Sequence, residues 1–286
     1  MGQPGASGMS NTSRRVCLGV GCLLVLAGMN PSTECGAEEI PHRPLVVAHR
    51  GLLRESPENT LSSFRACLEL RLGFEMDVLR SLDGKLVCIH DQTVDRTTDG
   101  KGRVDELTFR QIQALDAGSW FDARFAGERV PSIDAVFRLL AEYPDADVLV
   151  AVDIKQQDAR VERDLVRLAR RHNVLDRLLF IGRAILEEQV RERLRRASAR
   201  THIAQVAHDS EELVSSIADP LTDWVYVRYL PSEEEMRRVH QKGKRVFIAG
   251  SSVAGRELVG WRQAMAIGMD AILTDYSLEL AAQLRE

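Results

Sequence analysis

Cysteine is scarce in this sequence, and its placement excludes a fold stabilised by disulfide bonds. Only five cysteines occur in 286 residues, and three of them fall within the first 37. The other two, Cys67 and Cys88, lie in a helical and a strand-like segment, and two cysteines do not make a disulfide framework. We expect two buried free thiols, with a single bridge as the alternative.

An excess of basic side chains is also lacking. The chain carries 38 lysine and arginine residues against 42 aspartate and glutamate residues, a net charge of −4 that implies no basic face. Because non-specific nucleic-acid binding depends on clustered lysine and arginine, nucleic acid is excluded as a partner. With 44% hydrophobic and 28% charged residues, the composition is that of an ordinary globular protein.

Long apolar runs are absent except near the amino terminus. Arg14 and Arg15 precede an uncharged run over residues 16–29, and a polar stretch then leads to Ala37. This layout is typical of a secretory signal, so we predict a signal peptide and polar linker over residues 1–37, cleaved after Ala37. A retained membrane anchor is the alternative, but the run is shorter than the roughly 20 residues that span a bilayer.

Cleavage at this point predicts a secreted or periplasmic protein made of one domain over residues 38–286. The mature domain loses two basic residues and one acidic residue, which changes the net charge from −4 to −5. It contains no second apolar segment of spanning length, so we expect no stable membrane span in the mature protein. The sequence leaves open the oligomeric state and whether the chain starts at Met1 or Met9.

Short β-branched runs alternate with longer helical patterns through this domain, as in strand and helix units around a parallel sheet. Nine strands are expected, over residues 45–49, 74–78, 86–90, 148–154, 178–181, 202–206, 224–227, 245–248 and 271–273. Helical spacing is clear over residues 161–169 and 185–194, and Ser232 begins a capped helix. The pattern predicts an α/β barrel of eight strands with one strand in surplus.

The surplus strand belongs to a predicted hairpin between the second and third strands. Too few residues separate these strands for a helical crossover, and Asp83-Gly84 supplies a turn. A turn centred near Asp83 pairs Glu75 with His90. Period-two alternation then places Glu75 and Asp77 on the same face of the sheet.

A long connection over about residues 92–131 interrupts the regular alternation after the third strand. It contains four glycines, a helical patch over residues 107–115, and the aromatic residues Trp120, Phe121 and Phe125. A connection of this length at the mouth of a barrel is usually functional. Its aromatic residues either cover a substrate cleft or plug one end of the core.

Carboxylates at the ends of two predicted strands indicate a site for a hard cation. Glu75 and Asp77 point the same way from one strand, and Asp153 lies near the end of another. Ligation by oxygen alone favours Ca²⁺ or Mg²⁺ over zinc. The alternative is that Glu75 and Asp77 pair only with Arg50 or Arg80.

Two histidines at neighbouring strand ends favour acid and base catalysis. His49 ends the first predicted strand and His90 the third, and a histidine titrates near neutral pH. A phosphodiester requires neutralisation of its negative charge and protonation of its leaving oxygen. Arg50 and Lys155, with the cation, would supply the first, and a histidine the second.

The order and spacing of these motifs resemble the glycerophosphodiester phosphodiesterase family, which is part of the superfamily of phospholipase-C-like phosphodiesterases. The motifs are His49-Arg50-Gly51, Pro57-Glu58-Asn59-Thr60, Glu75-Met76-Asp77-Val78, Asp83-Gly84, His90-Asp91 and Arg96-Thr97-Thr98. Residues 117–121 and 124–131 resemble the insertion of bacterial members, and residues 268–275 resemble the last strand. The similarity covers nearly all of the predicted mature chain.

This resemblance implies an irregular barrel of the TIM type and a set of site residues. It implies His49 and His90 as the acid and base, and Arg50 and Lys155 as phosphate-binding residues. It implies Glu75, Asp77 and Asp153 as ligands of Ca²⁺ or Mg²⁺. Glu58 and Asn59 lie in the same mouth and are expected to support the ligands.

Two departures from the family pattern bear on the expected site. The third ligand is Asp153 in Asp153-Ile154-Lys155, where the family usually has glutamate, so the cation must shift or accept a water. Near the penultimate strand the family usually shows Trp-Thr-Val-Asn, whereas this chain has Phe247-Ile248-Ala249-Gly250. The second departure affects the substrate more than the chemistry.

The resulting expectation is a metal-dependent hydrolase that cleaves glycerophosphodiesters to glycerol 3-phosphate and an alcohol. Its partner would be a small-molecule or lipid-derived phosphodiester. One alternative keeps the chemistry and changes the substrate to a lysophospholipid, a sphingolipid or a phosphate-linked wall polymer. The other is a binding module that keeps the fold without catalysis.

Overall fold

The computed structural model describes residues 1–2, 43–156, 158–256 and 258–285. The helices and strands of these residues all lie within one compact unit, Ile40–Glu286. From residue 3 onward, the predicted signal peptide lies outside the described residues. No helix in the described part is both long and apolar enough to cross a membrane.

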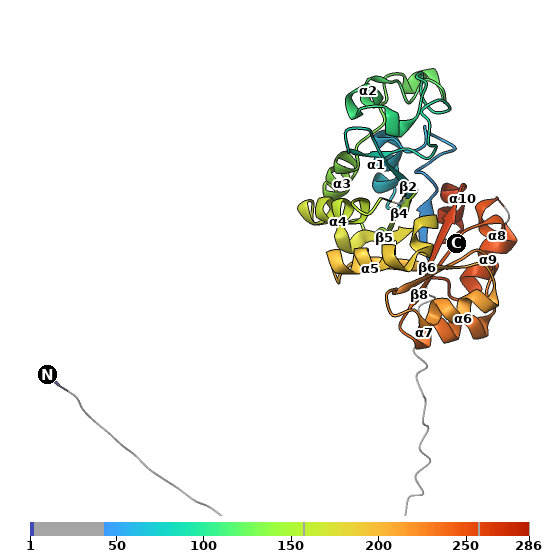
Figure 1. The fold of residues 1–286 in the computed structure, drawn as a ribbon. Helices are drawn as coiled ribbons and strands as arrows, with labels where there is room; N and C mark the ends of the chain where they lie inside the picture. The colour runs from blue at the N-terminus through green and yellow to red at the C-terminus, as the bar shows by residue number, and fades with distance from the viewer. Residues whose placement is uncertain (3–42, 157, 257, 286) are drawn as a thin grey trace, which may run out of the picture. The chain divides into compact units, whose positions relative to one another are not determined.

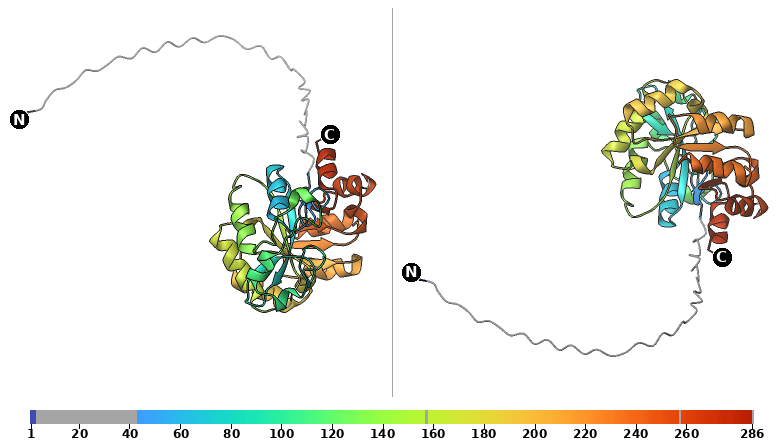
Figure 2. Two further views of the ribbon diagram at one scale, coloured as in Figure 1. Left: turned by 90° about the horizontal axis from the view of Figure 1, so that it is seen from above. Right: turned by 90° about the horizontal axis from the view of Figure 1, so that it is seen from below.

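Eight parallel strands close into a barrel, which confirms the predicted fold class. Seven of the eight pairings join strands in the order β1-β9-β8-β7-β6-β5-β4-β2, and the pairing of β1 with β2 completes the circle. Figure 2 shows the strands inside a ring of helices. The strands are β1 Leu45–Ala48, β2 Gly73–Arg80, β4 Val150–Ile154, β5 Leu178–Ile181, β6 His202–Ala207, β7 Trp224–Val227, β8 Arg245–Ile248 and β9 Ala271–Thr274.

The ninth strand, β3 (Leu86–Cys88), pairs antiparallel with β2, as the hairpin prediction required. The predicted pairing of Glu75 with His90 is wrong by one residue, because Val78 lies opposite Cys88. The reason is the turn: Ser81 N donates to Lys85 O at 2.9 Å, which leaves three residues in the loop. The strand also ends at Cys88, so His90 lies beyond it.

Helices follow most strands and cover the outside of the barrel (Figure 1). Ser232 caps the first turn of α7, as predicted, and the structure adds that Glu235 bonds back to the Ser232 backbone. The single helix predicted over residues 185–194 is interrupted at Glu187, whose backbone is extended. The helices are α1 Leu61–Glu69, α3 Ile133–Ala141, α4 Val161–Arg171, α5 Glu188–Ala197, α6 Ser210–Ala218, α7 Glu233–Gln241, α8 Ser251–Ala254, α9 Leu258–Ala266 and α10 Ser277–Gln283, with the 3-10 turns η3 Leu175–Arg177 and η4 Arg183–Leu186.

Two layers of apolar side chains hold the barrel together, one on each face of the strands. The inner layer fills the barrel with residues such as Val47, Trp224 and Phe247. The outer layer packs the strands against the helices and includes Cys67 and Cys88. Both cysteines are free and buried, as predicted.

The connection after β3 forms a small subdomain at one end of the barrel (Figure 1). It contains η1 Val104–Glu106, α2 Phe109–Ala114 and η2 Ala123–Phe125, and its own apolar cluster includes Ile112 and Val130. Trp120 is 38% exposed and contacts Phe121, which in turn contacts Phe125. The aromatic residues therefore do not plug the core, and that alternative is wrong; a role in covering a cleft stays a prediction.

Candidate active site

The predicted site residues gather at the carboxyl ends of the barrel strands, where barrel enzymes carry their reactive groups. Asp77 on β2 lies beside Asp153 on β4 in the parallel register, and Glu75 lies two residues earlier on β2. The alternation of the strand turns Glu75 and Asp77 to the same inner face, as predicted. Three carboxylates that are distant in the sequence thus meet at the mouth of the barrel.

Glu75, Asp77 and Asp153 form a compact acidic cluster whose ligand atoms all lie within 4.8 Å of one another. Glu75 and Asp77 are 2% and 1% exposed. Lys155 Nζ lies 2.5 Å from Asp153 Oδ2 and 3.0 Å from Asp77 Oδ1. Among the described residues, Asp153 Oδ1 is buried without a hydrogen-bond partner. A buried, unsatisfied carboxylate oxygen beside two further carboxylates fits a hard divalent cation.

The protonation of the cluster depends on burial and on the neighbouring charges. Burial, together with the charges of Asp77 and Asp153, raises the pKa of Glu75 well above 4.5. Burial opposes ionisation of Asp77, but Lys155 and Arg50 hold its pKa below the ordinary value. Burial raises the pKa of Asp153. A cation would favour the charged form of all three carboxylates.

A glycine makes room for the Asp153 carboxylate. Gly182 follows β5 with a φ of 104°, a backbone conformation that is nearly restricted to glycine. A Cβ atom at this position would lie 1.9 Å from Asp153 Oδ1. The loop after β5 therefore sets the space available to the third acidic residue.

The loop after β1 contacts the cluster from another side. Arg50 has a left-handed φ of 53°, and its backbone N–H donates to Glu75 Oε2 at 3.0 Å. Its guanidinium donates to Glu58 Oε1 at 3.0 Å and lies 3.6 Å from Asp77 Oδ2. The alternative pairing with Arg80 is wrong, because Arg80 binds carboxylates on the outer side of the barrel.

Asn59 ties the same loop to Asp77 through two hydrogen bonds. Its side-chain nitrogen donates to Asp77 Oδ2 at 2.8 Å, and its oxygen accepts from the Asp77 backbone N–H at 3.2 Å. Its φ of 57° is also left-handed. The strained loop is held by contacts with the acidic cluster, so the cluster and the loop position each other.

Each candidate histidine binds a carboxylate through Nδ1. His49 Nδ1 lies 2.7 Å from Oδ1 of Asp275, which follows β9, and His90 Nδ1 lies 2.7 Å from Asp91 Oδ1. Each histidine side chain is about one-third exposed. A carboxylate on Nδ1 fixes the tautomer and directs Nε2 for proton transfer.

A chain of ion pairs connects His90 to the loop after β1. Arg96 donates two hydrogen bonds to Asp91 and two to Glu58, at distances between 2.7 and 3.1 Å. Hydrogen bonding from Arg96 lowers the pKa of Asp91 to about 2. Glu58 also accepts from Arg50, so it joins both halves of the candidate site.

Sequence reasoning missed several residues that shape the site. Asp275 and Arg96 were recognised only as parts of motifs, and Gly182 was not singled out. The closure of the barrel could have indicated Asp275, because the last and first strands must be neighbours. No local pattern could have indicated Gly182, whose role depends on the position of the Asp153 side chain.

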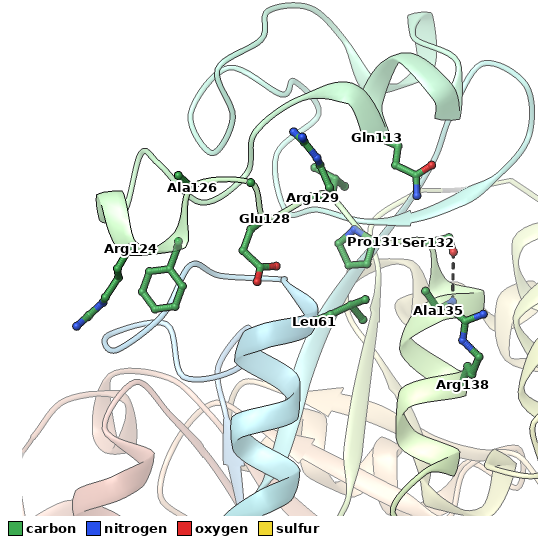
Figure 3. Close-up of a pocket in the computed structure, with 13 residues that line it drawn as sticks. Leu61, Gln113, Arg124, Ala126, Glu128, Arg129, Pro131, Ser132, Ala135 and Arg138 are labelled. Atoms are coloured by element: carbon green, nitrogen blue, oxygen red, sulfur yellow. Dashed lines mark hydrogen bonds between the residues drawn. The ribbon is translucent and has the colours of Figure 1, made fainter.

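Cavities near the insertion differ in which candidate site residues line them. A small one is lined by Glu58, Asn59 and His90, and none of the three described here is lined by an acidic residue of the cluster. A cavity of about 220 Å³ adjoins Lys155 and is lined mostly by polar side chains. A larger one of about 530 Å³ lies between the insertion and the beginnings of α1 and α3. Figure 3 shows that its lining includes Arg124, Glu128 and Arg138, and it contains none of the candidate site residues. The larger cavity is therefore separate from the candidate chemistry.

A closed parallel barrel with acidic, basic and histidine side chains at its carboxyl end defines a TIM barrel with the layout of a hydrolytic enzyme. The model of the glycerophosphoryl diester phosphodiesterase family matches residues 49–279. The chain belongs to this family.

Individual relatives agree with this assignment. A glycerophosphodiester phosphodiesterase of Caldanaerobacter subterraneus is 42% identical over 142 residues, which are 48% of this chain and 57% of that protein. Human glycerophosphodiester phosphodiesterase 1 is 36% identical over 49% of this chain and 44% of its own length. The chain thus matches about half the length of these curated relatives.

Solved structures extend the likeness over the whole barrel. A glycerophosphodiester phosphodiesterase from Agrobacterium tumefaciens is 26% identical, with a TM-score of 0.70 over 84% of this chain and 100% of that one. An Oleispira antarctica phosphodiesterase, solved with the product sn-glycerol-3-phosphate, has a TM-score of 0.70 at 20% identity, covering 85% and 97% of the two chains. At 20% identity, the likeness to the Oleispira antarctica structure shows a shared fold.

Proposed function

We propose that this protein is a metal-dependent phosphodiesterase that hydrolyses glycerophosphodiesters to glycerol 3-phosphate and an alcohol. The observation that carries the proposal is the buried cluster of Glu75, Asp77 and Asp153 beside two carboxylate-bound histidines. Membership of the family supports the substrate class. The product found in the Oleispira antarctica phosphodiesterase agrees with the proposed product.

The three carboxylates would hold the cation, with Ca²⁺ or Mg²⁺ as the candidates. When bound, the cation supplies charge to polarise the phosphoryl oxygens. Lys155 and Arg50 would bind the same phosphate, and their contacts with the acidic cluster support this role. These contacts with carboxylates would hold the Lys155 and Arg50 side chains in position before a substrate arrives.

His49 and His90 would exchange protons with the substrate. In the proposed first step, a neighbouring substrate hydroxyl attacks phosphorus, and one histidine accepts its proton. The bond to the leaving alcohol breaks, and the other histidine donates a proton to the departing oxygen. Water then opens the cyclic phosphate with the two roles reversed, which gives glycerol 3-phosphate and regenerates both histidines.

The layout of the first 37 residues supports a further part of the proposal. A basic pair followed by an uncharged run favours export and removal of this segment. The protein would then act on its substrate in the periplasm or outside the cell. Mass spectrometry of the exported protein would test this: a first residue near 38 supports the proposal, and an intact amino terminus contradicts it.

The activity itself is tested with glycerophosphocholine and the purified protein, with and without a chelator. We expect turnover that the chelator abolishes and that Ca²⁺ or Mg²⁺ restores. A His49→Ala/His90→Ala double variant should lose activity, whereas His208→Ala should keep it, because His208 is exposed and pairs only locally with Glu212. Turnover without a metal, or full activity of the double variant, would contradict the proposal.

A further inference from the structure

Arg228 brings a cation to the inner face of the barrel mouth. Trp224 and Tyr226 of β7 belong to the inner apolar layer, and Arg228 lies two residues further along the same face. Its Nη1 donates to the Tyr226 hydroxyl at 2.8 Å, and its guanidinium carbon lies 5.6 Å from the centre of that ring. The guanidinium thus folds back along the inner face.

The position next to Arg228 lacks a side chain. Gly250 follows β8 with a φ of 115°, and a Cβ atom there would lie 3.3 Å from Arg228 O and 3.5 Å from Arg228 Nε. This is the site where the sequence departs from the Trp-Thr-Val-Asn pattern. A Cβ atom at Gly250 would therefore touch the guanidinium at an ordinary contact distance and press against the carbonyl oxygen of Arg228.

Arg228 has no carboxylate within 4 Å among the described residues, and its guanidinium makes its hydrogen bond to a neutral phenol. By contrast, Arg50, Arg80 and Arg96 each contact two carboxylates. Tyr226 is close enough to the acidic cluster that the charges of Glu75 and Asp153 affect it, although burial is the main cause of its raised pKa. Arg228 is therefore a cation near the site with its charge still available.

The groups already assigned to the phosphate that is cleaved indicate what this cation would bind. Lys155 and Arg50 are proposed to bind that phosphate, and each of them also contacts Asp77. Arg228 adds one more positive charge. We propose that Arg228 binds a second anionic group of the substrate and makes this enzyme selective for phosphodiesters that carry a further phosphate or carboxylate. This inference rests on the proposed function and names its substrate class.

A matched pair of substrates tests the inference. Glycerophosphoinositol and glycerophosphoinositol 4-phosphate differ by one phosphate, and both release glycerol 3-phosphate for the same assay. We expect Arg228→Gln to lower the ratio of kcat/KM for the phosphorylated over the unphosphorylated substrate by about 10- to 100-fold, because one charged hydrogen bond is removed. Arg228→Lys should retain part of this preference, since it keeps the charge but not the planar fork.

A second variant tests the same contact by changing Gly250, the neighbour of Arg228. Gly250→Ala places a Cβ against Arg228 and should lower the same ratio. Gly127→Ala is its control, because Gly127 also has a positive φ, of 93°, but no atom lies within 4 Å of its Cβ position. The ratio should not change in the control.

The outcomes separate this inference from the proposed function. A ratio that stays the same in Arg228→Gln overturns the inference while leaving the activity in place. An equal loss on both substrates also overturns it, because Arg228 would then bind the phosphate that is cleaved. If the unmodified protein hydrolyses glycerophosphocholine but neither inositol substrate, only the inference is overturned; failure on all three substrates overturns the proposed function as well.

Discussion

Replacing Gly182 by alanine should disable the acidic cluster without altering any of its members. The new Cβ would lie 1.9 Å from Asp153 Oδ1, where ordinary contacts begin at 3.4 Å. The carboxylate must therefore withdraw by about 1.5 Å, or the loop after β5 must move. Either adjustment separates Asp153 from Glu75 and Asp77, whose ligand atoms now lie within 4.8 Å of its own.

Two effects of different size follow from this clash. The affinity for Ca²⁺ should fall by about 10- to 100-fold, as is typical when the neighbours of metal ligands are changed. That corresponds to about 1.4 to 2.7 kcal/mol of binding free energy. The free energy of unfolding should fall by about 1 to 3 kcal/mol, because alanine is strained at a φ of 104°. Calorimetric titration with Ca²⁺ measures the first effect, and chemical denaturation of the metal-free protein measures the second.

Gly243→Ala separates backbone strain from the clash. Gly243 has a φ of 71°, and no atom lies within 4 Å of its Cβ position. Its replacement should cost about 1 kcal/mol of stability and leave Ca²⁺ affinity unchanged. If Gly182→Ala bound Ca²⁺ as tightly as the unmodified protein and kept its activity, the assignment of Asp153 as a ligand would be refuted.

Three further predictions concern other parts of the molecule. Asp275→Asn should lower kcat at least about tenfold, which is less than the roughly 10²- to 10⁴-fold loss expected for His49→Ala. KM should change little and the pH profile should be altered. An unchanged kcat would contradict a positioning role for the Asp275 carboxylate. Ca²⁺ should raise the melting temperature more at pH 8 than at pH 5.5. The metal-free fold raises the pKa of Glu75 above 4.5, so its stability falls as the pH rises above 4.5, and at the lower pH the cation must also displace the Glu75 proton. An equal rise at both pH values would contradict this prediction. Ser232→Ala should cost about 1 kcal/mol and lower the melting temperature by about 2 to 4 °C, because it removes the cap of α7; an unchanged melting temperature would show that this cap is not stabilising.

Local patterns in the sequence were sufficient to predict most of the fold. All nine strands occur where β-branched runs are bounded by turns and helical segments, and no end differs from its predicted position by more than two residues. The meeting of Glu75, Asp77 and Asp153 was also predictable, because parallel strands end at the same edge of a barrel. The cap formed by Ser232 follows from contacts within a single helical turn.

Features that depend on tertiary packing were not predictable in the same way. The hairpin register depends on whether the turn holds two or three residues, and Asp83-Gly84 is compatible with either. The exposure of Trp120 depends on how the insertion folds on its own apolar cluster. The neighbours of Gly182 and Gly250 come from other strands, so no pattern around these glycines could identify them.

The contact between His49 and Asp275 joins residues that are 226 positions apart in the chain. The first histidine is therefore oriented only after β9 has docked against β1, which requires a contact between residues far apart in the sequence. A chain in which β9 has not yet docked contains the acidic residues and both histidines but lacks the carboxylate that orients His49. We therefore expect the proposed hydrolysis to require a complete barrel, with its last strand in place.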